Sequence, residues 1–226
     1  MFQEVYDNNI WAGKDDIPKS GGGSTLPMTV NIREAIKSVV LKYNIKSIVD
    51  APCGDLTWIQ TLFPFFEHGV EYIGVDIVPS EIARHKVNFP SLKFYVKDMV
   101  FDMVPKVDLI FSREALQHMN VEDNVRVTRN WQKSGSKYLM QTNYIYNWVD
   151  NKGEPVNVND ISVTDGHTIH IDFLKEPYNW KEPIDRYVEK EITTMTKGRV
   201  PLDRSFVEYS FIWDLRDGDV MNLQYT

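Results

Sequence analysis

Short apolar runs alternate with longer amphipathic stretches through the middle of this chain. Five of these runs have the length and residue types of buried strands: 47–50, 71–76, 92–98, 107–111 and 137–142. Helical stripes separate them: one after Pro27, one from Leu56 to Phe63 that ends before Pro64, one over 80–87, and one from Asn120 to Gly135. Strands that alternate with helices at this rhythm predict an α/β fold with a parallel sheet and helices on both of its faces.

The pattern changes beyond residue 142. Residues 143–179 are polar, rich in Asn and Asp, and without periodicity, so we expect a long excursion of the kind that is usually functional or mobile. Two strand-like runs follow near 186–192 and 206–215. Because the connection between them is short, we predict that they pair antiparallel at one edge of the sheet.

Composition and charge exclude several classes of protein. The 226 residues are 42% hydrophobic and 25% charged, which suits one globular domain with one core. The net charge is −7 and the Lys and Arg residues are scattered among acids, so we expect no nucleic-acid partner. The single Cys53 excludes an intrachain disulfide framework and a zinc site built on cysteines. No apolar run approaches the roughly 20 residues of a membrane span, and we expect a cytoplasmic protein.

Polar residues and a glycine stand where three of the predicted strands end. Ligands of open α/β sheets bind at the carboxyl ends of the strands. Gly54 follows the first strand, and a residue without Cβ lets the backbone approach a ligand closely. Asp76 ends the second strand, where an acid can accept from both ribose hydroxyls, and Asp98 ends the third, where it can accept from an adenine amino group. Each residue alone is typical of a turn or cap, but the ordered set predicts a nucleoside cofactor.

Over 46–142 the sequence resembles the class I S-adenosylmethionine-dependent methyltransferases. The matching segments are IVDAPCGD, YIGVDIV, FYVKDM and DLIFSREALQHM. The resemblance implies a Rossmann-like fold in which Gly54 holds the methionine part of S-adenosylmethionine, Asp76 the ribose and Asp98 the adenine. The family's glycine-rich DxGxGxG is reduced here to Gly54, with Pro52 and Asp55 beside it. One glycine among acids argues against a pyrophosphate ligand and suits a cationic sulfonium.

Three further features, two of them before residue 46, are similar to those of small bacterial and viral methyltransferases that modify glycans. They are Trp11-Ala-Gly13, the loop Ser20–Ser24, and an Arg-acid-x-Leu-x-His sequence after the fourth strand. This likeness implies that the loop and the next helix close over the cofactor carboxylate, with Arg33 as a bidentate partner. The alternatives are a flexible linker for the loop and a solvated helix charge for Arg33. A fusion or association with glycosyltransferases is also implied.

Together these features define the expected domain plan and cofactor contacts. We expect one domain over 1–226, with an N-terminal arm and cofactor-covering helix at 1–45, a cofactor-binding core at 46–142, and a substrate excursion with C-terminal strands at 143–226. The expected cofactor-binding residues are Trp11, Gly22, Ser24, Thr29, Arg33, Asp50, Pro52, Cys53, Gly54, Asp76, Ile77, Asp98, Met99 and Ser112.

Methylation of a sugar hydroxyl profits from a general base, typically by about 10²–10⁴-fold in rate. His118 follows the fourth strand and is the first candidate, while His68 and His85 lie in surface-like stretches and are interpreted as structural. Within 165–172, His167 and His170 offer an alternative base, a metal site with Asp165 and Asp172, or a surface turn. Their spacing matches no strong metal template, so no metal is expected. Arg113 and Glu114 can hold substrate hydroxyls.

The predicted function is O-methylation of a sugar hydroxyl in a glycan or a nucleotide sugar. Aromatic residues of the excursion can stack on sugar rings, although such clusters more often pack a core or a lid: Tyr144, Tyr146, Trp148, Tyr178 and Trp180. One alternative is N-methylation of a small molecule, although no Asn/Asp-Pro-Pro-Tyr signature follows the fourth strand. Another is a binding module that keeps the cofactor fold without catalysis.

Overall fold

The computed structural model describes residues 2–12, 17–146, 159, 170–194, 204–218 and 220. The helices are α1 (Phe2–Asp7), α2 (Val30–Lys42), α3 (Phe63–Phe66), α4 (Pro79–Asn88) and α5 (Val121–Lys133), with 3₁₀-helices at Gly22–Ser24, Pro27–Thr29, Ile59–Leu62 and Leu116–His118. The strands are β1 (Ser47–Asp50), β2 (Glu71–Asp76), β3 (Lys93–Val96), β4 (Leu109–Ser112), β5 (Tyr138–Tyr146), β6 (Asp185–Thr194) and β7 (Arg204–Asp214).

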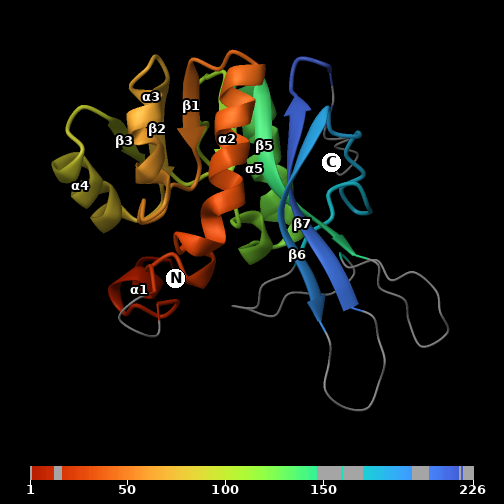
Figure 1. Ribbon diagram of the computed structural model, residues 1–226, viewed down its shortest axis with the longest axis horizontal. Coiled ribbons are helices and arrows are strands. Elements are labelled where there is room, and N and C mark those ends of the chain that lie inside the picture. The colour runs from red at the N-terminus through yellow and green to blue at the C-terminus, as the bar shows by residue number, and fades with distance from the viewer. Residues whose placement is uncertain are drawn as a thin grey trace.

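The seven strands form one mixed sheet in the order β3-β2-β1-β4-β5-β7-β6 (Figure 1). Strands β1 to β5 are parallel, whereas β7 runs antiparallel to β5 and β6 antiparallel to β7. The predicted parallel sheet with an antiparallel C-terminal edge is therefore confirmed. From β1 the chain builds outward through β2 and β3, then returns to place β4 on the other side of β1. This reversal makes the carboxyl ends of β1 and β4 the expected place for a ligand.

Helices cover both faces of the sheet, as predicted. On one face α2, α3 and α4 pack through residues such as Ile36, Val39 and Phe66. On the other face α5 packs through Val127 and Trp131. Figure 1 shows α2 crossing in front of the strands with α5 behind them, and α1 beyond the carboxyl ends. Apolar side chains of the central strands β1 and β4 are buried on both faces of the sheet, as is usual for parallel strands covered by helices.

Helix α5 begins and ends where its sequence signals indicate. The side chain of Asn120 accepts a hydrogen bond from the backbone nitrogen of Asp123 at 2.8 Å, which satisfies one of the free N–H groups of the first turn. After the helix, Gly135 has a φ of +73°, the left-handed conformation that follows many helix ends. The N-cap and the end of the helix could both be predicted from the sequence, because each depends on residues within one helical turn.

The predicted start of the excursion at residue 143 is wrong, because β5 continues to Tyr146. Its last residues pair with β7 as far as Tyr146↔Phe206, so the backbone groups of this polar stretch are satisfied by the ladder. The side chain of Asn143 is fully buried, donates to Asp172 Oδ1 at 3.2 Å and accepts from the Phe173 nitrogen at 2.7 Å. Polar composition alone therefore misplaced the strand end.

The helical stripe predicted over 56–63 is also only partly correct. The structure has a 3₁₀-helix at Ile59–Leu62 and then the short helix α3, Phe63–Phe66. Pro64 lies inside the first turn of α3 instead of beyond the end of a longer helix. A proline is tolerated there because the first N–H groups of a helix have no intrahelical acceptor.

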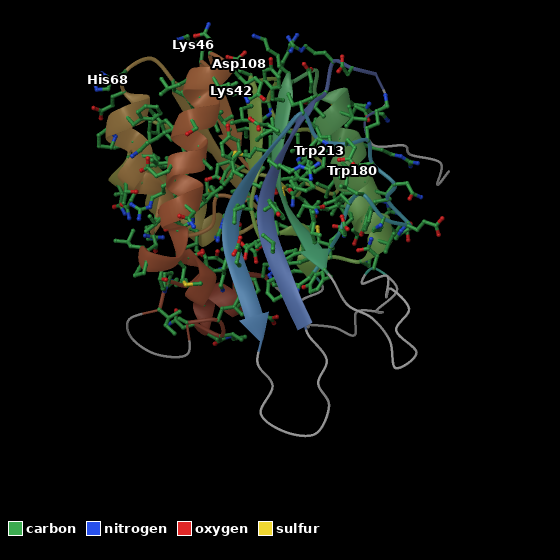
Figure 2. All side chains as sticks on the ribbon, turned by 45° about the vertical axis from the view of Figure 1, so that its right-hand side comes forward. Lys42, Lys46, His68, Asp108, Trp180 and Trp213 are labelled. Carbon is green, nitrogen blue, oxygen red and sulfur yellow. The ribbon has the colours of Figure 1, made fainter. Side chains whose placement is uncertain are left out.

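Two aromatic residues assigned to sugar stacking belong to the core. Tyr178 and Trp180 are 5% and 4% exposed. Trp180 stacks on Phe173 with ring centroids 4.3 Å apart and meets Trp213 edge-on at 5.0 Å (Figure 2). The segment around them covers the α5 face of the sheet, so its rings pack the protein and are not available to an acceptor. Tyr144 is likewise buried, and Trp148 lies outside the described residues.

No helix in the described part of the chain is long and apolar enough to cross a membrane.

Candidate functional site

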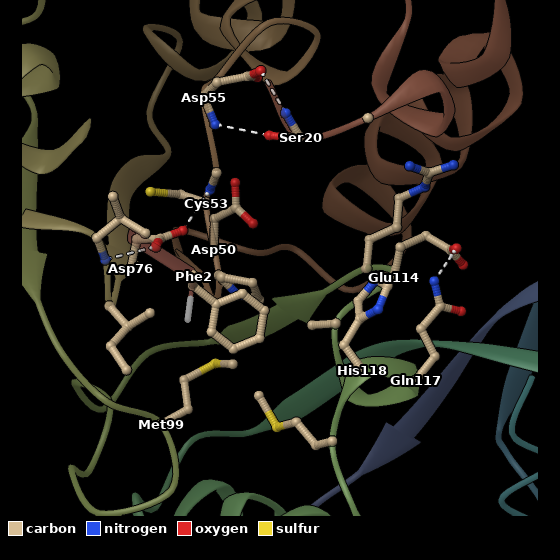
Figure 3. Close-up of a pocket in the computed structure, with 18 of the residues that line it drawn as sticks. Phe2, Ser20, Asp50, Cys53, Asp55, Asp76, Met99, Glu114, Gln117 and His118 are labelled. Atoms are coloured by element: carbon tan, nitrogen blue, oxygen red, sulfur yellow. Dashed lines mark hydrogen bonds between the residues drawn. The ribbon is translucent and has the colours of Figure 1, made fainter. Parts of the chain in front are cut away.

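A cavity of about 690 Å³ opens at the carboxyl ends of the parallel strands. Its walls come from α1 and the arm, the turn after β1, the ends of β2 and β3, and the segment after β4 (Figure 3). Most of the predicted site residues line it: Trp11, Gly22, Ser24, Asp50, Pro52, Cys53, Gly54, Asp76, Ile77, Asp98, Met99, Arg113, Glu114 and His118. The fold thus brings together residues that are far apart in the sequence.

Three predicted cofactor contacts, Thr29, Arg33 and Ser112, lie outside the lining of this cavity. The guanidinium of Arg33 donates to the carbonyl oxygens of Thr29 at 3.2 Å and Leu26 at 3.0 Å. It therefore satisfies carbonyls just before and at the start of its own helix and does not reach for a ligand. Ser112 is fully buried within β4. His167, the alternative base, lies outside the described residues.

The turn after β1 is shaped for close approach at Gly54. This residue has a φ of +57°, and a Cβ added there would lie 2.6 Å from the hydroxyl oxygen of Ser20. Its backbone nitrogen donates to Asp76 Oδ2 at 2.9 Å, and the Val78 nitrogen donates to the other oxygen at 3.0 Å. Burial raises the pKa of Asp76 to about 6, so the carboxyl is mostly ionised at neutral pH. Asp76 consequently presents a fixed acceptor at the cavity.

His85 contacts the backbone of this turn and is buried, contrary to its predicted surface position. The residue is fully buried in α4, and its Nε2 lies 2.7 Å from the carbonyl oxygen of Gly54. Its ring packs against Phe94 at 5.3 Å. Because α4 packs on the sheet through Ile82 and His85, one helical turn apart, the helical periodicity was the signal that could have placed it inside.

Sequence reasoning missed the residues that attach the arm to the turn. The Ser20 nitrogen donates to Asp55 Oδ2 at 3.0 Å, and the Asp55 nitrogen donates to Ser20 Oγ at 3.1 Å (Figure 3). The hydroxyl of Tyr6 lies 2.9 Å from Ser20 Oγ. These hydrogen bonds therefore hold the loop and α1 against the turn that contains Gly54. No local sequence pattern predicts these hydrogen bonds, because each joins residues that are distant in the chain.

The floor of the cavity holds a buried acid, Asp50. It is 3% exposed and accepts a hydrogen bond from the hydroxyl of Tyr72 at 2.6 Å. Burial raises the pKa of Asp50 to about 8. At neutral pH this group is therefore largely protonated, and it presents a neutral polar edge instead of a charge.

One end of the cavity combines an apolar slot with a carboxylate. Met99 is buried and Ile77 is half exposed, and both line the slot beside Asp98. The Val100 nitrogen donates to Asp98 Oδ1 at 2.9 Å, which holds that carboxylate in place and leaves its other oxygen without a bond to the described residues. A flat apolar ring that carries a hydrogen-bond donor fits such a slot.

The opposite wall carries His118 and Glu114 (Figure 3). Burial lowers the pKa of His118, so its imidazole is neutral at neutral pH. Neither ring nitrogen of His118 forms a hydrogen bond within the described residues. Glu114 has a φ of +54°, unusual for a residue with a side chain, and it accepts from Gln117 Nε2 at 2.7 Å and from the Tyr144 hydroxyl. Burial raises the pKa of Glu114.

Arg113 lines the cavity, and its guanidinium also bonds to three other parts of the protein. Its Nε donates to Glu189 Oε2 at 2.7 Å, and a second nitrogen lies 3.6 Å from Glu208 Oε1. Nη1 donates to the carbonyl oxygen of Gly23 at 3.2 Å. Arg113 thus joins the β6–β7 hairpin to the loop that roofs the cavity. This link depends on residues from three distant segments.

The described residues hold no group of three or more His, Cys, Asp or Glu side chains arranged for a metal ion. Asp165 and His167, two of the four residues considered for a metal, lie outside these residues. Of the other two, Asp172 bonds to Asn143, and His170 stacks on Tyr144 at 4.3 Å.

Comparisons with known proteins identify the fold. No family model and no curated protein sequence matches the chain. The solved structure of the N-methyltransferase NodS from Bradyrhizobium japonicum, in complex with S-adenosyl-l-homocysteine, matches with a TM-score of 0.53 and 12% identity, over 92% of this chain and 98% of that chain. This likeness confirms the Rossmann-like methyltransferase fold.

Two further solved structures are less similar to this chain. The magnesium protoporphyrin IX methyltransferase of Synechocystis PCC 6803 matches with a TM-score of 0.44 and 11% identity, over 92% of this chain and 90% of that chain. An O-methyltransferase domain of StiE matches with a TM-score of 0.42 and 16% identity over 51% of this chain. The match spans 45% of that StiE chain, less than half of its length.

Proposed function

We propose that this protein is an S-adenosylmethionine-dependent methyltransferase and that the cavity after β1 to β4 holds the cofactor. Its volume of about 690 Å³ lies within the roughly 300–1,000 Å³ usual for small-molecule sites. Gly54 lines the cavity in a turn where a Cβ would meet Ser20, Asp76 offers acceptors to a ribose, and Asp98 closes an apolar slot suited to adenine. S-adenosylmethionine, when bound, supplies an electrophilic sulfonium methyl group.

The charge of the lining supports a cationic cofactor over a pyrophosphate-bearing one. Asp55, Asp76 and Asp98 line the cavity together with one lysine, Lys97, and the guanidinium of Arg113 is already paired with Glu189. A pyrophosphate needs several backbone N–H groups or free cations, which glycine-rich turns usually supply. The single-glycine turn here offers its N–H to Asp76 instead.

The observation that carries the acceptor proposal is the position of His118 on the cavity wall and the neutral form of its imidazole. A neutral imidazole on the cavity wall, with no hydrogen-bond partner among the described residues, is equipped to accept the proton of a hydroxyl. A sugar hydroxyl is too weak an acid to ionise unaided near neutral pH, so it needs such a base. We therefore propose a sugar hydroxyl, in a glycan or a nucleotide sugar, as the acceptor.

A second candidate, N-methylation of a small amine, is favoured by Glu114. This carboxyl lines the same wall, and within the described residues it forms no ion pair, because the neighbouring Arg113 is taken by Glu189 and Glu208. An ammonium group bound beside this buried carboxyl would favour its ionised form and pair with it. Such an acceptor must lose its proton before methyl transfer, but it needs no base as strong as an alcohol does.

The experiment is methyl transfer from isotope-labelled S-adenosylmethionine to two panels, deoxysugar-containing glycans and small amines. Label in the glycans, together with a loss of about 10²–10⁴-fold in His118→Ala at unchanged affinity for S-adenosylhomocysteine, is the expected result. Label only in the amines would overturn the sugar acceptor and keep the methyltransferase. Failure to bind S-adenosylmethionine at millimolar concentration would overturn both and favour a non-catalytic module.

A further inference from the structure

Trp11, one of the expected cofactor contacts, lines the cavity and also lies against the candidate base. Its indole stacks on the imidazole of His118, with ring centroids 5.1 Å apart and 25° between the planes. The two residues are far apart in the sequence, one in the N-terminal arm and the other after β4, and both line the cavity. Nothing in the sequence links them.

The indole is held by aromatic residues of α1. Phe2 and Tyr6 meet Trp11 edge-on, with centroids 6.1 Å and 6.4 Å away. Tyr6 is in turn bonded to Ser20, which is bonded to Asp55 of the glycine turn. These contacts therefore restrain the position of the Trp11 indole.

A stacked ring restrains an imidazole in a way that leaves its chemistry free. The indole covers one face of His118, while both nitrogens lie in the plane of the imidazole and remain accessible from its edge. Covering a face also removes water, and burial is the one cause that lowers the pKa of His118. Tyr6 of α1, Glu114 of the segment after β4, Asp123 of α5 and Asp98 after β3 line the same cavity, and none of them shifts this pKa.

We propose that Trp11 is a positioning residue for His118: it sets the plane of the imidazole and keeps water from one of its faces. The proposal rests on the proposed function in so far as His118 acts as the base. Two physical effects of the indole oppose each other. An aromatic face attracts a cationic imidazolium and favours the charged ring, whereas exclusion of water disfavours it. Because burial is the one cause of the lowered pKa of His118, we expect exclusion of water to prevail and the pKa to rise when Trp11 is removed.

The test is an NMR pH titration of the His118 imidazole in the full chain, with its resonance identified by its loss in His118→Gln. In Trp11→Ala we expect the pKa of His118 to rise by roughly 0.5–1 unit toward its ordinary value of about 6.5. Trp11→Phe keeps a ring and is expected to give a smaller rise. Ile10→Ala is the matched control, because Ile10 precedes Trp11, is 58% exposed and does not line the cavity. It should leave the titration unchanged.

An unchanged or lowered pKa of His118 in a folded Trp11→Ala or Trp11→Phe variant would overturn the proposal. So would an equal rise in Ile10→Ala, because the effect would then belong to the arm as a whole. With an active acceptor, the acidic limb of kcat/KM against pH should move in the same direction as the NMR pKa. If the NMR pKa moves but His118→Ala keeps full activity, the contact stands and the assignment of His118 as the base fails.

Discussion

The backbone nitrogen of Gly54 donates to Oδ2 of Asp76 across 2.9 Å, so the turn after β1 and the end of β2 are one bonded unit. Parallel pairing sets this proximity, because Asp50↔Gly74 register places the two strand ends side by side. The acid expected to hold a ribose is therefore also the acid that fixes the glycine turn. Changes at either residue should affect the same ligand.

Asp76→Ala should weaken S-adenosylhomocysteine binding by about 10–100-fold, because hydrogen bonds to a charged group are worth roughly 1.5–3 kcal/mol. The carboxylate anchors Gly54 and Val78 and offers the acceptor for the ribose. Calorimetric titration of the variant measures the effect. Glu67→Ala, an exposed acid at the end of α3, is the control and should bind as the unchanged protein does. Equal affinity in Asp76→Ala would refute this placement of the cofactor.

Gly54→Ala should lower both stability and cofactor affinity. The left-handed φ of +57° costs an alanine about 1–2 kcal/mol, and its Cβ would lie 2.6 Å from Ser20 Oγ, so the arm must move. Thermal unfolding and calorimetry with S-adenosylhomocysteine test the two effects. Gly22→Ala has no atom within 4 Å of the added Cβ and should unfold at an unchanged temperature. Comparable unfolding temperatures for the two variants would contradict the argument.

The buried Asp50 should make stability fall as the pH rises. Its pKa is about 8 in the folded protein and near 3.9 in an unfolded chain, so the folded state holds this proton more tightly. The resulting contribution is complete below about pH 4 and is lost progressively up to pH 8. Asp50→Asn removes it, so the free energy of unfolding should depend less on pH in the variant. Urea unfolding between pH 4 and 8 measures the slope of the unfolding free energy against pH for the unchanged protein and for the variant. Equal slopes would exclude the raised pKa of Asp50.

Arg113→Lys should loosen the roof of the cavity while keeping the charge. A lysine can pair with Glu189 but cannot also donate to Gly23 and approach Glu208 in the fixed fork of a guanidinium. We expect a loss of about 1–3 kcal/mol in unfolding free energy and weaker S-adenosylhomocysteine binding. Glu189→Gln should reproduce part of both effects. Because the two groups act as a pair, their double variant should lose less than the sum of the single losses, and strict additivity would oppose the link.

The strand ends were predictable because their determinants are local. Gly54, Asp76 and Asp98 each follow a short apolar run, and a parallel sheet gathers such ends at one edge whatever the rest of the chain does. The antiparallel edge was also predictable, since two apolar runs with a short connection have few other ways to pair. The errors arose where tertiary packing overrides composition. The polar Asn143 stays in β5 because Asp172 and Phe173 satisfy its side chain.

The sequence by itself determined the α/β sheet, its antiparallel edge and the set of residues at the carboxyl ends of β1 to β3. These follow from apolar periodicity and from turn residues a few positions apart. Only the tertiary structure decided the partners of those residues: Arg33 turns back to its own helix, Arg113 joins Glu189 to Gly23, and Trp11 covers His118. Such contacts depend on where side chains from distant segments meet, and a flexible Arg or Trp has many partners within reach until the packed core fixes one of them.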